Sequence, residues 1–145
     1  MNRIRRMNKE DLQRVVEMEK ETFSQPWTQE GFWNAMQLPK NCFLVIEDEE
    51  GVQGYCGYYQ VLDEAEVMNV CVKKEKRGRG LGKAMMKQLL AYAKKGGAAS
   101  IVLEARVSNE AAIHVYETLG FVALGVRKGF YEQPTEDALI MQCIF

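Results

Sequence analysis

The residues with the clearest chemical potential form the stretch KRGRGLGKAMMKQLL, which runs from Lys76 to Leu90. Three glycines and several cations stand here directly before an apolar stretch with the period of a helix. The start of a helix offers backbone N–H groups without partners and a partial positive charge, and glycines let a ligand approach that backbone. The stretch therefore predicts a site for an anion, in particular a phosphate.

Three kinds of glycine-rich phosphate loop can be compared with this stretch. A Walker loop needs four residues between its glycines and a hydroxyl residue after its lysine, but only three residues separate Gly78 from Gly82 and an alanine follows the lysine. The dinucleotide fingerprint G-x-G-x-x-G also fails, because the glycines stand at 78, 80 and 82. The pattern R/Q-x-x-G-x-G/A fits through Arg77, Gly80 and Gly82. A solvated basic turn before an amphipathic helix is the alternative interpretation.

A second group of candidate residues lies in the second half of the chain. Glu104 stands in SIVLEARV, which is predicted to be a largely buried strand, and a lone carboxylate there is costly unless it is paired, hydrated or functional. A salt bridge to Arg106, on the same strand face, is the structural alternative. Asn109 and Tyr116 are seven residues apart on the next predicted helix and share one face. Tyr116 taken alone favours a core aromatic with its hydroxyl at the rim, but Glu104, Asn109 and Tyr116 together after a phosphate loop favour a site.

The elements that position these residues follow from hydrophobic periodicity and turn signals. Asn8 and Thr28 are candidate N-caps of the first two helices, and a glycine pair at 96–97 ends the third. The predicted order is strand, two helices, three strands, helix, strand, helix and two strands. We therefore expect a single mixed α/β domain over residues 1–145, with about seven strands, four helices and a βαβ crossover in the middle. The predicted segments are strand 2–7, helix 8–23, a short helix from 28, hairpin 42–62, strand 64–74, a helix to about 95, strand 100–107, helix 108–121, and the pair 122–131 and 136–144.

Composition narrows the class of protein. The 145 residues suit one domain with a real core, and 27% charged with 47% hydrophobic residues indicates a folded chain. The net charge of −1 argues against nucleic acid as a partner. The apolar runs are too short for a membrane span, and no signal-peptide core follows the basic N-terminus, so we expect a cytoplasmic protein with no membrane partner. A nucleic-acid interpretation rests only on Lys73, Lys74, Lys76, Arg77 and Arg79.

The cysteines indicate reduced, buried thiols. Cys42, Cys56, Cys71 and Cys143 are scattered and form no CxxC pair. The single histidine, His114, has no cysteine at ligand spacing, so we expect no metal. A nucleophilic role for Cys71 in a ping-pong reaction is conceivable, but a small side chain that fills a strand is the preferred interpretation.

The whole chain resembles the GNAT superfamily of N-acetyltransferases and, within it, the RimI-type ribosomal-protein-alanine N-acetyltransferases. The stretches that carry the resemblance follow the family's order and span most of the chain. The final hairpin, GFYEQPTEDALIM, is shorter than the usual form in the family. The matching stretches are FSQPWT, LDEAEVMNVCV, RGRGLGKAMM, LEARVSNEAAIHVYETLGF and EDALIM.

The resemblance implies an enzyme that uses acetyl-CoA as co-substrate and needs no metal. Its implied substrate is a protein N-terminus, specifically the N-terminal alanine of the eighteenth small-subunit ribosomal protein. Other protein N-termini, lysine or a small amine are the alternatives, and a non-catalytic acyl-CoA-binding module is a competitor of another class. We expect a monomer or a weak dimer.

The resemblance also implies roles for particular residues. Glu104 would be the general base and Tyr116 the general acid. Asn109 would contact the pantetheine arm of the cofactor, which would pair with the backbone of Val70, Cys71 and Val72. The pyrophosphate would be held by Gly78, Arg79, Gly80, Leu81, Gly82 and Lys83.

Three aromatic residues are candidates for the substrate side. Phe23, Trp27 and Tyr131 stand in loop-like segments, where binding residues often lie. In the resembling family these regions flank the peptide, so Trp27 and Tyr131 are the predicted substrate-binding residues. Ordinary core packing is the equal alternative for Phe23 and Trp27.

Overall fold

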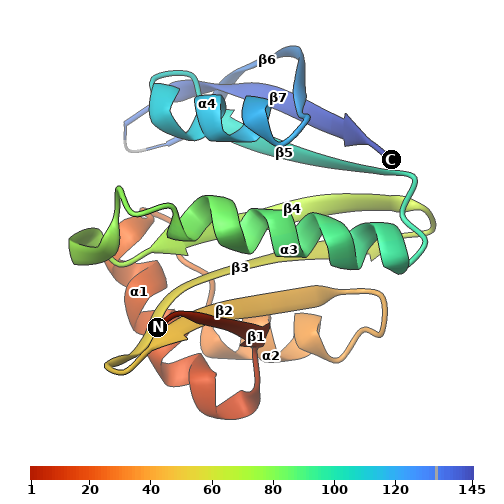
Figure 1. Cartoon of the computed structure of the whole chain (residues 1–145). Helices are drawn as coiled ribbons and strands as arrows, with labels where there is room; N and C mark the ends of the chain where they lie inside the picture. The colour runs from red at the N-terminus through yellow and green to blue at the C-terminus, as the bar shows by residue number, and fades with distance from the viewer. Residues whose placement is uncertain (133) are drawn as a thin grey trace.

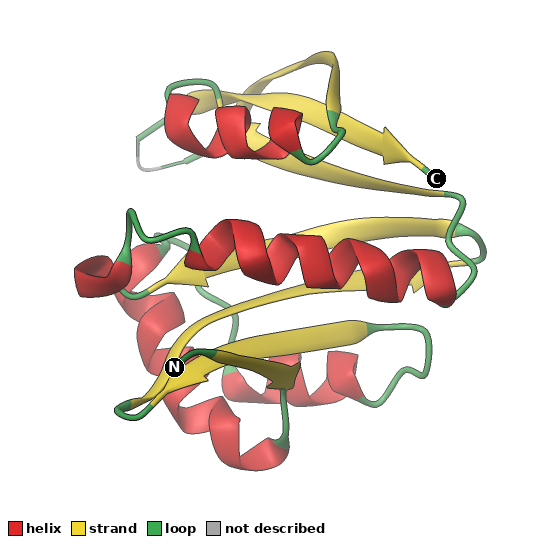
Figure 2. Cartoon of the chain, in the orientation of Figure 1, coloured by secondary structure: helices red, strands yellow, loops and turns green. Residues whose placement is uncertain are grey.

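The computed structural model describes residues 1–132 and 134–145, in which one seven-stranded sheet carries helices on both faces (Figures 1 and 2). The strand order across the sheet is β1-β2-β3-β4-β5-β7-β6. The strands are β1 (Arg3–Arg6), β2 (Cys42–Asp48), β3 (Gly51–Val61), β4 (Glu64–Val72), β5 (Ser100–Arg106), β6 (Val122–Tyr131) and β7 (Glu136–Ile144). The helices are α1 (Leu12–Thr22), α2 (Gln29–Met36), α3 (Leu81–Lys95) and α4 (Glu110–Thr118), with the 3-10 turns η1 (Lys9–Asp11) and η2 (Lys74–Lys76). The predicted element order and fold class are confirmed.

The pairing of β4 with β5 is the unusual feature of the sheet. These two strands run parallel and are joined by α3, which confirms the predicted βαβ crossover. They pair only through 64–66 and 100–102 and then part (Figure 1). Just beyond, β4 has a bulge, because its register on β3 shifts between Gly57 and Tyr58. Among the described residues, the rest of β4 pairs with β3 on one edge and with no strand on the other.

Two hydrophobic cores lie on opposite faces of the sheet because the strands alternate. In β2, Leu44 and Ile46 face α3, whereas Phe43 and Val45 face α1 and α2. In Figure 1, α3 and α4 lie on one side of the sheet and α1 and α2 on the other. The helix α3 is anchored at helical spacing by the buried residues Leu81, Met85, Met86, Leu89 and Ala93.

The first two helices begin as their caps dictate, with one difference from the sequence prediction. The Thr28 hydroxyl accepts a hydrogen bond from the Gly31 amide at 3.0 Å, so this predicted cap is confirmed. Asn8 precedes the 3-10 turn η1, and α1 starts only at Leu12. The reason is local: the Asp11 carboxylate accepts from the Asn8 amide at 2.8 Å and so closes a tight turn before the helix.

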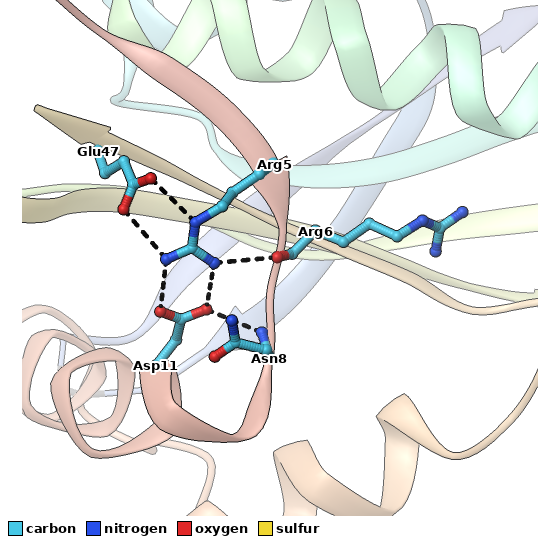
Figure 3. Close-up of polar contacts among 5 residues, drawn as sticks. All are labelled: Arg5, Arg6, Asn8, Asp11 and Glu47. Carbon is cyan, nitrogen blue, oxygen red and sulfur yellow. Dashed lines mark hydrogen bonds and ion pairs between the residues drawn. The ribbon is translucent and has the colours of Figure 1, made fainter.

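A partly buried ion cluster fixes the start of α1 to the edge of the sheet (Figure 3). The Arg5 guanidinium donates to both Asp11 oxygens, at 2.8 and 2.9 Å, and to both Glu47 oxygens, at 3.0 and 3.1 Å. Burial would raise the pKa of the Asp11 carboxyl, but the hydrogen bonds from Arg5 and Asn8 hold that pKa below its ordinary value. The cluster therefore stabilises the fold only while its carboxylates are ionised.

We predict that Asp11→Asn lowers the free energy of unfolding by about 3 kcal/mol near neutral pH, because it leaves the Arg5 charge partly unpaired. The folded pKa of Asp11 lies below its unfolded value, so its stabilisation is present above about pH 4 and is lost as pH falls further. Urea unfolding of wild type and variant at neutral and strongly acidic pH measures both effects. The exposed neighbour variant Glu10→Gln is the control, and an equal loss in that variant would contradict the prediction.

Candidate active site

The glycine-rich loop turns sharply into α3. Gly80 precedes the helix with φ of 78°, and Gly78 also has φ of 78°, so both adopt the left-handed conformation that glycine allows. No atom lies within 4 Å of the place where either residue would carry a Cβ. The amides of residues 81–83 open the helix and have no intrahelical acceptor. This geometry suits an anion, and the phosphate role of Gly78, Arg79, Gly80, Leu81, Gly82 and Lys83 stays a prediction.

The cations of the loop differ in their contacts. The Lys76 ammonium lies 3.0 Å from Glu50 and 3.4 Å from Asp48, so it ties the loop to the turn between β2 and β3. The exposed side chains of Arg79 and Lys83 remain as the cations at the mouth of the helix. Sequence reasoning treated all these cations alike, because the contact of Lys76 with a distant turn has no local signal.

The edge of β4 that faces away from β3 presents backbone groups beside this loop. Lys73 donates its amide to the Gln53 carbonyl of β3 at 2.8 Å. Since backbone groups alternate along a strand, those of Val72 and Val70 point to the opposite edge. The Arg77 Nε accordingly reaches the Val72 carbonyl at 2.9 Å. The open edge of β4, defined as the backbone of Val70 and Val72, thus ends where the loop begins.

Cys71 fills the strand between these two residues. Its side chain is 3% exposed, and its Sγ lies 3.3 Å from the Thr22 hydroxyl. Burial raises the pKa of the thiol, which disfavours the thiolate that a nucleophile needs. The strand-filling interpretation therefore holds. The backbone of Cys71 points to β3, where it pairs with Tyr55, and its predicted cofactor contact stays a prediction.

Glu104 lies half-buried on β5, beyond the point where β4 and β5 part. Burial raises the pKa of its carboxyl, and the nearby carboxylate of Glu66 raises it further. The alternative of a salt bridge from Glu104 to Arg106 is wrong. Arg106 instead lies 3.2 Å from Glu136, because β7 rather than β4 runs beside this part of β5.

Tyr116 and Tyr131 line the same neighbourhood from two other elements. Burial raises the pKa of Tyr116 to about 12, and the nearby Tyr131 contributes. Burial also raises the pKa of Tyr131 to about 12, with a contribution from Glu104. Both phenols are therefore protonated at neutral pH. Tyr131 on β6 is thus a neighbour both of Glu104 on β5 and of Tyr116 on α4.

Tyr116 also packs as a core aromatic, and Tyr131 has a charged neighbour. The Tyr116 ring lies 5.9 Å from that of Phe121. The Arg106 guanidinium stands 4.5 Å from the centre of the Tyr131 ring. The Tyr116 ring packs in the same way whether its role is structural or chemical. Only its hydroxyl distinguishes the two roles.

Two further predicted residues have structural partners. Asn109 is exposed and caps α4, since its Oδ1 accepts from the Ala112 amide at 3.2 Å. The Trp27 ring packs 5.3 Å from the Phe32 ring, and Phe23 packs against the same core. Packing thus accounts for the aromatic rings, while the predicted contacts of Asn109 with pantetheine and of Trp27 with substrate stay predictions.

Sequence reasoning missed Glu66. It faces the same side of the sheet as Glu104 because 66 pairs with 102 across the parallel strands. Alternation within EAEV marks 64 and 66 as one face, but only the parallel pairing shows that Glu104 is their neighbour. A shallow pocket of about 200 Å³ lies on this face, lined by Tyr59, Val61, Glu64, Ala65, Glu66, Ser100 and Val102.

Two findings concern other kinds of site. Within residues 1–132 and 134–145, no group of three or more His, Cys, Asp or Glu side chains could hold a metal ion. No helix in the described part of the chain is both long enough and apolar enough to cross a membrane.

Comparison with known proteins finds relatives that are named as acetyltransferases. The model of the Acetyltransferase (GNAT) family matches residues 12–121. A Bacillus subtilis protein named "Putative [ribosomal protein bS18]-alanine N-acetyltransferase" is 37% identical over 139 residues, 95% of this chain and 92% of that protein. The ribosomal protein bS18-alanine N-acetyltransferase of Escherichia coli K12 is 32% identical, covering 97% of this chain and 96% of that protein. The crystal structure of the Escherichia coli ribosomal-protein-S18-alanine N-acetyltransferase matches with a TM-score of 0.89 at 31% identity, over 99% of this chain and 94% of that one.

We predict that Gly80→Ala weakens acetyl-CoA binding at least about tenfold, because the side chain disfavours the left-handed turn that aims the helix amides at the phosphate. Calorimetry with acetyl-CoA measures the change. Gly97→Ala is the matched control, since Gly97 also has positive φ, at 90°, with no atom within 4 Å of an added Cβ, but lies at the far end of α3. Equal affinity losses in the two variants would contradict a specific role of the loop.

Proposed function

Because the chain belongs to the GNAT family of acetyltransferases, we propose that it transfers the acetyl group of acetyl-CoA to the N-terminal α-amine of a protein. The enzyme is an acetyl-CoA-dependent N-acetyltransferase. The substrate that we propose is ribosomal protein bS18, at its N-terminal alanine. The observation that carries this proposal is similarity along 95–97% of the chain to two relatives named for that activity.

The proposed substrate suits a carboxylate base. Acetyl transfer needs a neutral amine, and an α-amino group has a reference pKa of about 7.7–8.0 against about 10.4 for lysine. Removing the proton from lysine at neutral pH therefore costs roughly 3 kcal/mol more. Glu104, whose pKa burial and Glu66 raise, is a suitable base for the α-amine, directly or through one water.

The departing group is the thiolate of CoA, and Tyr116 would donate a proton or hydrogen bond to it. The raised pKa of Tyr116 keeps its proton in place until a strong acceptor develops. The bond from the carbonyl carbon to sulfur breaks as the bond to the amine nitrogen forms. Glu104 would take a proton from the amine, and Tyr116 would give a proton or hydrogen bond to the thiolate. Acetyl-CoA itself supplies the activated acyl group.

The binding roles divide between the two parts of the sheet. The open edge of β4 would hold the pantetheine arm, with Asn109 across from it, and the glycine-rich loop would hold the pyrophosphate. Trp27 and Tyr131 would contact the substrate peptide. Since a ribosomal protein is the proposed substrate, the proposal includes a cytoplasmic location for the activity.

A peptide panel tests the proposed function. We expect a peptide with the N-terminal residues of bS18 to be acetylated on its first nitrogen, as located by tandem mass spectrometry. The same peptide with a blocked N-terminus and an internal lysine is the control. Acetylation of lysine or of a small polyamine, without acetylation of N-termini, would overturn the substrate proposal while leaving the enzyme class intact. Binding of acetyl-CoA with no transfer to any amine would favour the non-catalytic module.

We predict that Glu66→Gln lowers the pKa of Glu104, because it removes a neighbouring negative charge that favours the protonated form. The raised pKa delays ionisation of the base, so the variant should ionise Glu104 at lower pH than wild type does. Carbon-detected NMR of the Glu104 carboxyl group across a pH series measures this shift. Glu64→Gln removes the same charge from an exposed position of β4 and is the control. A shift no larger than that control would show that Glu66 does not act on Glu104.

A further inference from the structure

Glu19 is a buried carboxylate that the proposed roles above do not use. It lies on α1 with an exposed fraction of 0%. Its oxygens accept hydrogen bonds from the Tyr55 hydroxyl, from Asn69 Nδ2 at 2.9 and 3.1 Å, and from the Trp27 amide at 3.0 Å. A buried carboxylate is costly unless such donors surround it, and these donors come from three separate segments.

Packing alone does not account for a carboxylate at this position. The surrounding core is formed by apolar residues such as Val15, Met18 and Phe32. A well-packed apolar side chain often stabilises such a position as well as buried charge does. A satisfied polar network instead gives geometric specificity, because it fixes the relative positions of its donors.

Two of the three donor residues lie in elements of the candidate active site. Asn69 lies at the bulge of β4, directly before Val70 and the open edge. Trp27 belongs to segment 23–28, which joins α1 to α2. Tyr55 is the partner of Cys71 in the sheet, so it supports the network from β3. One carboxylate therefore links segment 23–28 to the strand whose edge faces the cofactor in the proposed function.

Segment 23–28 also reaches the part of the molecule beyond the parting of β4 and β5. The Ser24 hydroxyl donates to the Glu132 carbonyl at 3.1 Å, and Gln25 Nε2 donates to the Glu132 carboxylate at 2.8 Å. Both of these hydrogen bonds are exposed, so water competes with them and they hold the segment weakly. The part-buried bond from the Trp27 amide to the buried Glu19 carboxylate is the firmer attachment. Glu132 directly follows Tyr131. The segment, which contains the predicted substrate contact Trp27, therefore also lies beside the other predicted contact, Tyr131.

We propose that Glu19 is a positioning residue for the peptide side of the reaction. It holds segment 23–28 against the β4 bulge, so that the segment and the open edge of β4 face the substrate amine in one fixed geometry. This inference rests on the proposed function. It predicts that loss of the Glu19 acceptor affects peptide use much more than cofactor binding.

The test compares Glu19→Gln with wild type in steady-state kinetics on the bS18 peptide. Glutamine keeps the shape but places an NH₂ donor among the donors of the network, so one bond must be lost. We expect kcat/KM for the peptide to fall at least about tenfold, mainly through KM, the size of effect that follows when a buried donor loses its partner. The Kd of acetyl-CoA, measured by calorimetry, should change by less than about twofold.

Asp11→Asn is the matched control for stability. Asp11 is the other buried carboxylate at this helix, 6% exposed, and it bonds Arg5 and Asn8 rather than segment 23–28. We expect this variant to lose stability without a rise in peptide KM. An unchanged peptide KM in folded Glu19→Gln would overturn the proposal, and so would an equal rise in Asp11→Asn or a parallel loss of acetyl-CoA affinity.

A milder variant covers the case in which Glu19→Gln does not fold. Asn69→Ala removes two of the hydrogen bonds and leaves those from Tyr55 and Trp27, so we expect a smaller rise in peptide KM in the same direction. An unchanged KM in folded Asn69→Ala would then overturn the proposal.

The failure of the substrate proposal is recognised separately, because wild type itself would not acetylate the bS18 peptide. The same comparison is then made with whichever amine wild type accepts. Trp27 fluorescence in a Trp33→Phe background gives a readout without turnover, since release of segment 23–28 in folded Glu19→Gln should shift its emission to the red. An unshifted emission would contradict the proposed anchoring.

Discussion

The parting of β4 and β5 is the constraint on which the rest of the site depends. The strands pair only through 64–66 and 100–102, so everything beyond lacks the hydrogen bonds that a continuous sheet would provide. Backbone groups without strand partners need other partners. Arg77 donates to the Val72 carbonyl, and the remaining groups of Val70 and Val72 are open to a ligand that can bind as an added strand. Glu104 also lies beyond the parting, and burial and the neighbouring Glu66 raise the pKa of its carboxyl. The edge proposed for the cofactor and the candidate base therefore both lie beyond the break in pairing.

A sheet that opens in this way needs other contacts to keep its two parts in register. Segment 23–28 supplies such contacts, because it is anchored by Glu19 on one side and by weaker bonds to Glu132 on the other. Arg106 holds the far side together, because it bonds Glu136 and the Glu132 carbonyl and lies over the Tyr131 ring. Polar networks therefore add to the apolar packing that holds the rings of Trp27 and Tyr116. Such networks are specific in geometry, which is the property that acyl transfer between two bound substrates requires.

The parts of this architecture that depend on local pattern could be predicted from the sequence. Strand alternation and helical spacing yield the element order, and Gly80 directly before an amphipathic helix predicts the turned loop. The contacts that join distant segments could not be predicted. The bridge from Glu104 to Arg106 is a reasonable expectation for neighbours on one strand face, but β7, the last strand of the chain, brings Glu136 to Arg106 instead. Glu66 and Glu19 gain their significance only from pairing across parallel strands and from a three-segment network. The roles of the candidate site residues stay predictions.

Backbone hydrogen exchange at the open edge of β4 tests the central claim most directly. Exchange of individual amides is measured by NMR in the free protein and with saturating CoA. The amides of Val70 and Val72 should exchange readily without ligand and become at least about tenfold slower with CoA, because the cofactor then accepts or shields those N–H groups. The amide of Val126, on the exposed edge strand β6, should not respond. Bound CoA with unchanged exchange at both Val70 and Val72 would contradict the claim that this edge holds the cofactor.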